Sequence, residues 1–195
     1  MAIFEETVDN DPFKEELRVL KLKPEDCSIK VEKLSKSYTL NEKAVSNLSF
    51  GLEYGECFAL LGVTGAGKTS TFKCLTGEEG ADVGELFMGG HDVRTQAGFE
   101  KARCMIGYCP QFDAIWDGLT VREHLEFYAS MKGVRGDLRE ELVDKQVKEM
   151  DLTAYAHVNA GTLSGGNKRK LSCAIALIGN PPIVLLDEPS TGVDP

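Results

Sequence analysis

The segment from residue 57 to residue 75 constrains the fold more than any other part of the chain. Residues 57–61 read Cys-Phe-Ala-Leu-Leu, an apolar run typical of a strand buried on both faces of a parallel sheet. Residues 62–69 follow the pattern G-x-x-x-x-G-K-[ST], and a helix is predicted from about 68 to 75. A strand, a glycine loop and a helix in this order predict an α/β fold.

The residue types of this loop suit a nucleoside triphosphate. Several backbone N–H groups must point at one anion, and glycines let the chain curl closely enough to allow it. The loop also opens a helix, whose N-terminus adds positive potential. We expect Lys68 to reach the β- and γ-phosphates and Thr69 to offer its hydroxyl to Mg²⁺. The predicted nucleotide-binding residues here are Gly62, Thr64, Gly65, Ala66, Gly67, Lys68, Thr69 and Ser70. A chance glycine-rich turn is the alternative, and the flanking strand and helix argue against it.

A second candidate site is the acid pair that ends another apolar run. Residues 183–186 read Ile-Val-Leu-Leu, which predicts a second doubly buried strand, and Asp187 and Glu188 follow it. Ligands of open α/β sheets bind at the carboxyl ends of the strands, so we expect Asp187 beside the phosphate loop, holding Mg²⁺ directly or through water. Glu188 is then placed to polarise an attacking water. The alternative is a strand that ends in a solvated acidic turn.

The remaining pattern predicts strands near 29–38, 48–52, 85–88 and 103–108, and helices behind a Thr120–Glu123 capping box, over 138–150 and over 164–178. Leu138, Leu142 and Val147 are expected on the apolar face of the middle helix. Strands that alternate with helices imply a mainly parallel sheet with helices on both faces. No strand pattern interrupts the helices, which predicts a helical subdomain at about 112–178. Residues 1–27 are acidic with little periodicity, as in a linker or arm.

Charge and cysteine usage exclude several classes of protein. The formal net charge of −9 disfavours nucleic acid as a non-specific partner. No stretch approaches the roughly 18 apolar residues of a membrane span, and the N-terminus lacks the basic and apolar regions of a signal peptide. The six cysteines show no metal-ligand spacing, and several lie in apolar runs. We interpret them as reduced core residues of a cytosolic domain.

A third motif points to a family. Residues 163–167 read Leu-Ser-Gly-Gly-Asn and open a predicted helix between the phosphate loop and the acid-ended strand. In that order the segment resembles the signature sequence of the ATP-binding-cassette (ABC) ATPases, and the resemblance covers about residues 28–195. The segments CFALLGVTGAGKTSTFKCLTGE, MIGYCPQFDAIWDGLTVREHLEFYA and SGGNKRKLSCAIALIGNPPIVLLDEPSTGVDP resemble the A subfamily, whose members move lipids or related amphiphiles.

This resemblance implies a P-loop NTPase core with a mainly parallel sheet, an N-terminal antiparallel β part and a helical subdomain. It implies that Tyr38 stacks on adenine, and that Gln111 senses Mg²⁺ and contacts the transmembrane domains of a transporter. Residues 190–194 would form a loop at the interface of a head-to-tail dimer. In that dimer Ser164, Gly165 and Gly166 contact the partner's nucleotide. The implied catalytic residues are Lys68, Gln111 and Glu188, and the implied magnesium ligands are Thr69, Gln111 and Asp187.

The function implied is ATP hydrolysis that powers transport at the cytoplasmic face of a membrane. The sequence departs from the family in one respect. The family's switch histidine lies beyond the dimer loop, whereas His91, His124 and His157 all precede the acid pair, so the C-terminal portion is expected to be missing. Two alternatives therefore stay open: an ATP-binding module that does not hydrolyse ATP, and a soluble ABC protein.

We interpret the cations at 168–170 as mostly structural or dimer-facing, and His124 as a surface or packed residue.

Overall fold

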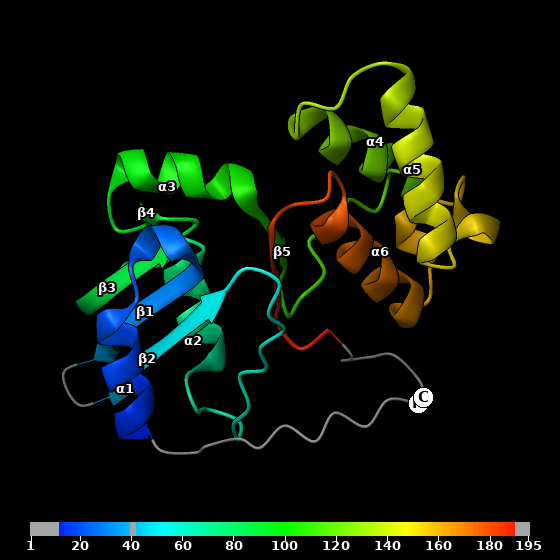
Figure 1. Ribbon diagram of the computed structural model, residues 1–195. Coiled ribbons are helices and arrows are strands. Elements are labelled where there is room, and N and C mark those ends of the chain that lie inside the picture. The colour runs from blue at the N-terminus through cyan, green and yellow to red at the C-terminus, as the bar shows by residue number, and fades with distance from the viewer. Residues whose placement is uncertain (1–11, 40–41, 190–195) are drawn as a thin grey trace, which may run out of the picture.

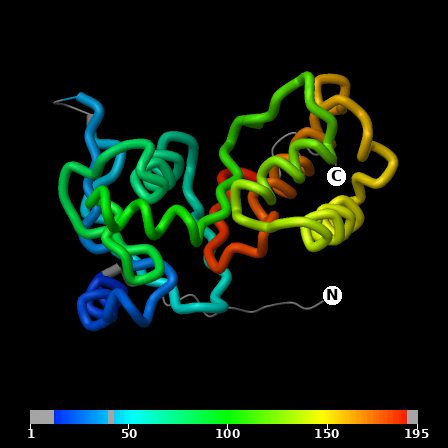
Figure 2. The backbone as a smooth tube through the Cα atoms, turned by 90° about the horizontal axis from the view of Figure 1, so that it is seen from above, coloured from blue at the N-terminus to red at the C-terminus, as the bar shows by residue number. Residues whose placement is uncertain are grey.

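The structure is a computed structural model that describes residues 12–39 and 42–189. It has a β-rich part built on a four-stranded antiparallel sheet and a part made of helices (Figure 1). A short parallel pair of strands lies between the two parts, which are well separated in the perpendicular view of Figure 2. Within the described residues, no helix is both long and apolar enough to cross a membrane.

The antiparallel sheet has the order β2-β1-β3-β4. Its strands are β1 (Cys27–Thr39), β2 (Glu42–Glu53), β3 (Val83–Met88) and β4 (His91–Asp92). Ile29 of β1 pairs with Leu52 of β2 and Met88 of β3, and two residues later Val31 pairs with Phe50 and Leu86. Because side chains alternate along a strand, these two rungs face the same side and bury their apolar groups in one core.

The parallel pair consists of β5 (Ile106–Cys109) and β6 (Ile183–Leu186). The predicted strand at 103–108 starts three residues late, because residues 103–105 form the 3-10 turn η2 (Arg103–Met105). Burial alternates along β6: Ile183 and Leu185 are buried, whereas Val184 and Leu186 are 37% and 38% exposed. The prediction that this strand is buried on both faces is therefore wrong in the part of the chain that the structure describes.

Residues 57–61 also differ from the prediction. The segment pairs with no strand among the described residues, and Leu61 is 87% exposed. It runs from β2 toward β6 and returns to α2 (Lys68–Leu75), with Phe58 stacked on Phe50 at 5.1 Å between ring centroids (Figure 1). An apolar run becomes a strand only where a neighbour pairs its N–H and C=O groups, and a local pattern cannot provide that neighbour. Four of the five residues expected in the core, Cys57 among them, are exposed here, and Leu60 is half-buried.

The acidic segment before β1 contains a helix that the sequence analysis did not predict. Residues 12–21 form α1 (Pro12–Lys21), which packs against β2, and its Val19 is fully buried. Arg18 binds Glu15 at 2.7 Å and donates a short hydrogen bond to the carbonyl of Gly51 in β2. The expected linker therefore includes a packed helix, and residues 1–11 lie outside the described residues. The 3-10 turn η1 (Pro24–Asp26) connects α1 to β1.

The helical part has its own apolar core. It is built from α4 (Val121–Met131), α5 (Asp137–Glu149), α6 (Gly165–Leu177), η3 (Thr153–Tyr155) and η4 (Ala160–Thr162). The predicted capping box is confirmed, since Thr120 and Glu123 bond reciprocally at the start of α4. On α5 the buried face is Val143, Gln146 and Val147, whereas Leu138 is 70% exposed. The helix α3 (Gln96–Ala102) was not predicted.

Candidate nucleotide site

The glycine loop adopts a backbone that its sequence requires. Gly65 and Gly67 have positive φ angles of 84° and 87°, and Gly67 is the N-cap of α2. A Cβ atom on Gly67 would lie 2.2 Å from the carbonyl oxygen of Ala44, so the close approach of β2 to the loop permits only glycine. Residues 62–66 are exposed, and the predicted helix at 68–75 is confirmed. The loop therefore presents backbone to solvent at the N-terminus of α2, where an anion is favoured.

Lys68 lies over this loop. Its ammonium group donates hydrogen bonds to the carbonyl of Gly62 at 2.8 Å and to that of Val63 at 3.3 Å. Thr69 and Ser70 follow on the first turn of α2 and are half-buried. These contacts hold the cation next to the exposed N–H groups, which is the position that the phosphate-binding prediction requires.

Tyr38 lies beside the same helical turn. Its hydroxyl donates a hydrogen bond to the Ser70 hydroxyl at 3.2 Å, and its side chain is 49% exposed. Lys36 places its ammonium group 5.6 Å from the ring centroid. An exposed ring at the edge of a phosphate loop offers a surface on which a purine can stack.

We therefore expect that the Tyr38→Ala variant binds ATP about 5- to 100-fold more weakly, because base–aromatic stacking contributes roughly 1–3 kcal/mol. Inorganic tripolyphosphate has no base, so its affinity should not change. Tyr38→Phe is the matched control, since it keeps the ring and removes only the hydroxyl, with its hydrogen bonds to Ser70 and Glu79. Calorimetric titration of the three chains with both ligands tests this, and equal losses for ATP and tripolyphosphate would contradict stacking.

The acid pair follows β6 directly. The Asp187 amide donates to the carbonyl of Cys109 at 2.9 Å and so extends the β5–β6 ladder by one bond. The Asp187 side chain is 1% exposed, and its Oδ2 atom has no hydrogen-bond partner among the described residues. Tyr108 lies on the neighbouring strand, where burial and the charge of Asp187 raise the pKa of its phenol to about 12. A buried carboxylate oxygen without a partner is suited to hold a cation.

Gln111 and Glu188 meet beyond the ends of the two strands. The Gln111 amide donates to Glu188 Oε2 at 3.2 Å, although 77 positions separate them in the chain. Because β5 and β6 are parallel, their carboxyl ends lie at the same edge and bring the two side chains together. Glu188 has a positive φ of 48°, which is uncommon for a residue other than glycine and occurs most often at constrained sites.

Arg169 of α6 has a burial and a bonding pattern that its sequence context did not predict. It was grouped with its two lysine neighbours, yet its side chain is 2% exposed. Its guanidinium group donates hydrogen bonds to one carboxylate, that of Asp113, and to five backbone carbonyls on the two loops that follow β5 and β6. The carbonyls are those of Pro110, Gln111, Asp187, Glu188 and Pro189. One cation thus joins the Gln111 loop to the acid pair, which confirms a structural role.

A helical pattern could have identified this role. Arg169 lies three, four and seven positions before Ser172, Cys173 and Ala176, which places all four residues on one face of α6. Ser172 and Ala176 are buried. Lys170 belongs to a different face and pairs at the surface with Asp151 at 3.1 Å. A cation on the small-residue face of a helix is therefore the signal that separates Arg169 from its neighbours.

One cavity of about 720 Å³ joins the two predicted sites. Gly62 and Lys68 of the loop and Asp187 and Glu188 of the acid pair all line it, together with apolar side chains of the sheet and of residues 57–61. Phe72 of α2 stacks on Tyr108 of β5 at 6.4 Å between ring centroids, which holds the helix of the loop against the parallel pair. The cavity size lies in the range of small-molecule sites. Tyr38, Gln111 and Ser164 are not part of its lining.

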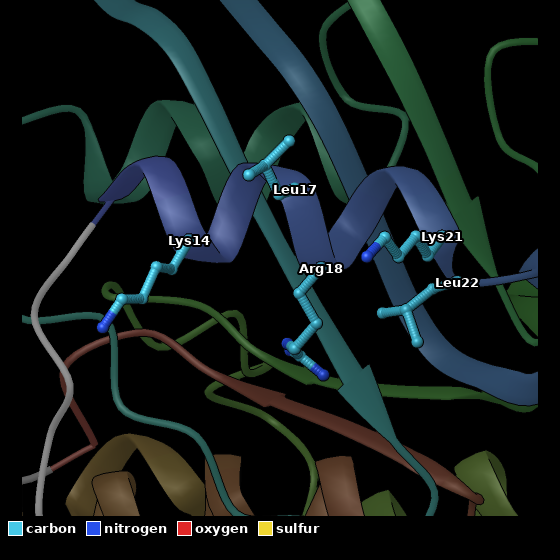
Figure 3. A pocket seen from close by; sticks show the side chains of 5 residues that line it. All are labelled: Lys14, Leu17, Arg18, Lys21 and Leu22. Atoms are coloured by element: carbon cyan, nitrogen blue, oxygen red, sulfur yellow. The ribbon is translucent and has the colours of Figure 1, made fainter.

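A smaller pocket of about 390 Å³ lies along α1 (Figure 3). It is lined by Lys14, Leu17, Arg18, Lys21 and Leu22, which project from the helix and the residue after it. None of the predicted site residues is among them. It is therefore separate from the candidate nucleotide site.

The magnesium prediction fits the residues at the acid pair. The described residues contain no group of three or more histidine, cysteine, aspartate or glutamate side chains able to hold a metal by themselves. Mg²⁺ commonly takes one or two protein ligands and completes its shell with water and phosphate oxygens. The orphaned Oδ2 of Asp187 is a suitable ligand of this kind, and Thr69 carries a hydroxyl on the first turn of α2, directly after the phosphate loop.

The signature segment begins α6 as expected. Ser164 is the N-cap, and its hydroxyl accepts a hydrogen bond from the Asn167 amide at 3.3 Å. Ser164 and Gly165 are exposed, so they are accessible to a second molecule. The predicted dimer loop at 190–194 lies outside the described residues.

His124 is fully buried and forms hydrogen bonds with the backbone of Trp116 and Thr120, which confirms its interpretation as a packed residue.

Comparison with known proteins agrees with this geometry. The family model described as ABC transporter matches residues 45–191. Human ATP-binding cassette sub-family A member 2 is 47% identical over 191 residues, which cover 96% of this chain and 8% of the relative. Human phospholipid-transporting ATPase ABCA3 is 45% identical over 192 residues, with 96% of this chain and 11% of the relative covered. The chain thus spans about a tenth of the length of these curated relatives.

Solved structures show the same fold. The ATP-binding subunit of an ABC transporter superposes with a TM-score of 0.76 at 28% identity, covering 86% of this chain and 68% of that one. A bacterial ABC transporter cassette solved as a dimer has a TM-score of 0.77 at 26% identity, covering 85% of this chain and 76% of that one. Sequence motifs, site geometry and both comparisons agree that the chain belongs to the ABC transporter family and is similar to members of the A subfamily.

Proposed function

We propose that this domain binds Mg-ATP on the 62–70 loop and hydrolyses it to power the movement of phospholipids or related amphiphiles by a membrane-embedded partner. The observation that carries the proposal is the common cavity of Lys68, Asp187 and Glu188. Lys68 shares this cavity with two carboxylates of different environment, Asp187 buried and Glu188 exposed. Phosphoryl transfer requires this combination of positioning and charge neutralisation.

The proposal assigns a role to each residue in or near the cavity. The loop amides and Lys68 bind the phosphates, and Tyr38 stacks on the adenine. Thr69, Gln111 and Asp187 would hold Mg²⁺, which neutralises phosphate charge when bound. Glu188 accepts a hydrogen bond from the attacking water and orients it, and Gln111 holds Glu188 through its 3.2 Å contact. Arg169 is a positioning residue, because it fixes the backbone on which Gln111, Asp187 and Glu188 stand.

A second copy of the domain, or a similar one, is proposed to complete the site. In this proposal Ser164, Gly165 and Gly166 contact the γ-phosphate of a nucleotide bound to the partner. A related cassette, with a TM-score of 0.77 at 25% identity, has been solved as a dimer in a post-hydrolysis state with ADP and Pi. In our proposal a single copy hydrolyses ATP slowly, because half of each site comes from the other copy.

The transport role rests on two observations. Two of the similar human proteins are named phospholipid-transporting ATPases. The helical part also exposes large apolar side chains after Gln111, at Phe112, Trp116, Phe127 and Met131. We propose that transmembrane domains dock there, and that residues 28–195, with a helical subdomain at about 112–178, form the nucleotide-binding domain on the cytoplasmic side of the membrane.

The Lys68→Ala variant tests nucleotide binding. We expect Mg-ATP to bind about 10- to 100-fold more weakly, because a hydrogen bond to a charged group contributes roughly 1.5–3 kcal/mol. Lys148→Ala, at an exposed position of α5, is the control and should bind as the parent does. Isothermal titration calorimetry gives the affinities, and circular dichroism verifies that both variants fold. An unchanged affinity for Lys68→Ala would show that the nucleotide binds elsewhere.

A further inference from the structure

Two cysteines face one another across the contact between β5 and α6. The sulfur atoms of Cys109, at the end of β5, and Cys173, in α6, are 3.7 Å apart. Both are free thiols. Cys109 is 0% exposed, whereas Cys173 is half-buried and within reach of a small solute. The pair joins segments 64 positions apart in the chain.

The surroundings of Cys173 favour reaction at this sulfur. Arg169 lies one helical turn before it on the same face of α6 and binds the carbonyl of Pro110, the residue after Cys109. The hydrogen bond with Cys109, and then the charge of Arg169, lower the pKa of Cys173, although burial and the carboxylate of Asp113 oppose them. The difference in exposure also indicates that Cys173 is the first sulfur to react, because a peroxide reaches it before it reaches the buried Cys109.

We propose that Cys109 and Cys173 are an oxidation site, at which a peroxide converts the two thiols into an intramolecular disulfide between β5 and α6. The Cys173 thiolate attacks one peroxide oxygen, the O–O bond breaks, and Cys173 becomes a sulfenic acid, while the departing hydroxide takes up the proton that the thiol released and leaves as water. The Cys109 sulfur then attacks Cys173, the S–S bond forms, and the hydroxyl leaves as water with the Cys109 proton. Overall, two thiols and one hydrogen peroxide give one disulfide and two waters, and two electrons pass to the peroxide.

The geometry makes this bond accessible. A disulfide has sulfur atoms about 2.05 Å apart, so the two sulfurs must approach by roughly 1.6 Å from 3.7 Å. The bond would connect the apolar core of the β-rich part, to which Ile106 of β5 belongs, with the apolar core of the helical part, to which Leu171 of α6 belongs. It would also join the strand that leads to Gln111 to the helix that Ser164 begins.

Peptide mapping of the folded chain tests the site directly. We expect hydrogen peroxide, followed by alkylation and proteolysis, to yield a peptide pair linked through Cys109 and Cys173, which a thiol reductant separates. The Cys57→Ser/Cys104→Ser double variant, which removes the two exposed thiols, should form the same link. The site is overturned if Cys57 and Cys104 become oxidised in the parent chain and no Cys109–Cys173 link is found.

A second measurement tests the order of the steps. In the Cys109→Ser variant the sulfenic acid on Cys173 cannot be resolved, so dimedone should label Cys173. In Cys173→Ser, dimedone should leave Cys109 unlabelled because it is buried. Labelling of Cys109 to the same extent would overturn the assignment of Cys173 as the first sulfur to react. Neither readout depends on ATP hydrolysis, so failure of the proposed function and failure of this site remain distinguishable.

Discussion

Replacing Glu188 by glutamine is expected to lower ATP turnover by about 10²- to 10⁴-fold, which is the typical contribution of a positioned general base. ATP binding should be kept, because Glu188 contacts Gln111 and is proposed to orient the attacking water, whereas phosphate binding is assigned to Lys68 and the loop. The variant is also expected to accumulate as an ATP-bound dimer, because in the proposed mechanism nucleotide joins the two copies and hydrolysis releases them.

Phosphate release and sedimentation velocity with Mg-ATP measure the two effects. Glu141→Gln, at an exposed position of α5, is the matched control and should hydrolyse ATP at the parent rate. A Glu188→Gln chain that stays monomeric with full turnover would remove Glu188 from the mechanism. A parent chain that binds ATP tightly and releases no phosphate would instead favour the alternative of a binding module without hydrolysis.

The Arg169→Met variant is expected to show the largest loss of stability, with the free energy of unfolding lowered by about 3–5 kcal/mol. Methionine keeps most of the side-chain volume and removes the donors that serve five carbonyls and Asp113. Those acceptors are then left without this partner near the protein interior, and the Asp113 charge loses its ion pair at 3.3 Å.

Lys170→Met is the matched control, because it changes the next residue in the same way. Lys170 pairs with Asp151 at the surface, where the Asp151 side chain is 93% exposed, so the expected loss is below about 1 kcal/mol. Urea unfolding followed by circular dichroism compares the two variants. Equal losses would show that Arg169 contributes no more than an ordinary surface cation.

Local signals in the sequence were reliable where the structure depends on neighbours in the chain. The helix at 68–75 was predicted because a loop with two positive-φ glycines starts it. The Thr120–Glu123 capping box was predicted because its two hydrogen bonds join residues three apart. The order of the loop, the signature and the acid pair was enough to indicate the family, because these motifs are short and contiguous.

Burial and strand pairing depend instead on segments that are distant in the chain. Residues 57–61 and 183–186 have equally apolar sequences, yet only the second run forms a strand, because β5 is there to pair with it. The acidic residues before β1 gave no sign that α1 would pack on β2. An apolar pattern records that a segment can be buried, and the partner that buries it is specified elsewhere in the chain.

The sequence by itself determined which residues are candidates to bind and cleave a triphosphate, because loop curvature, helix N-termini and side-chain charge are local properties. Only the tertiary structure decided how they are assembled: Gln111 bonded to Glu188, Lys68 and Asp187 lining one cavity, and Arg169 buried between two strand-end loops. These contacts join residues from 18 to 119 positions apart (187 − 169 and 187 − 68). Their formation depends on the parallel pairing of β5 with β6 and on the packing of α2 and α6 against that pair.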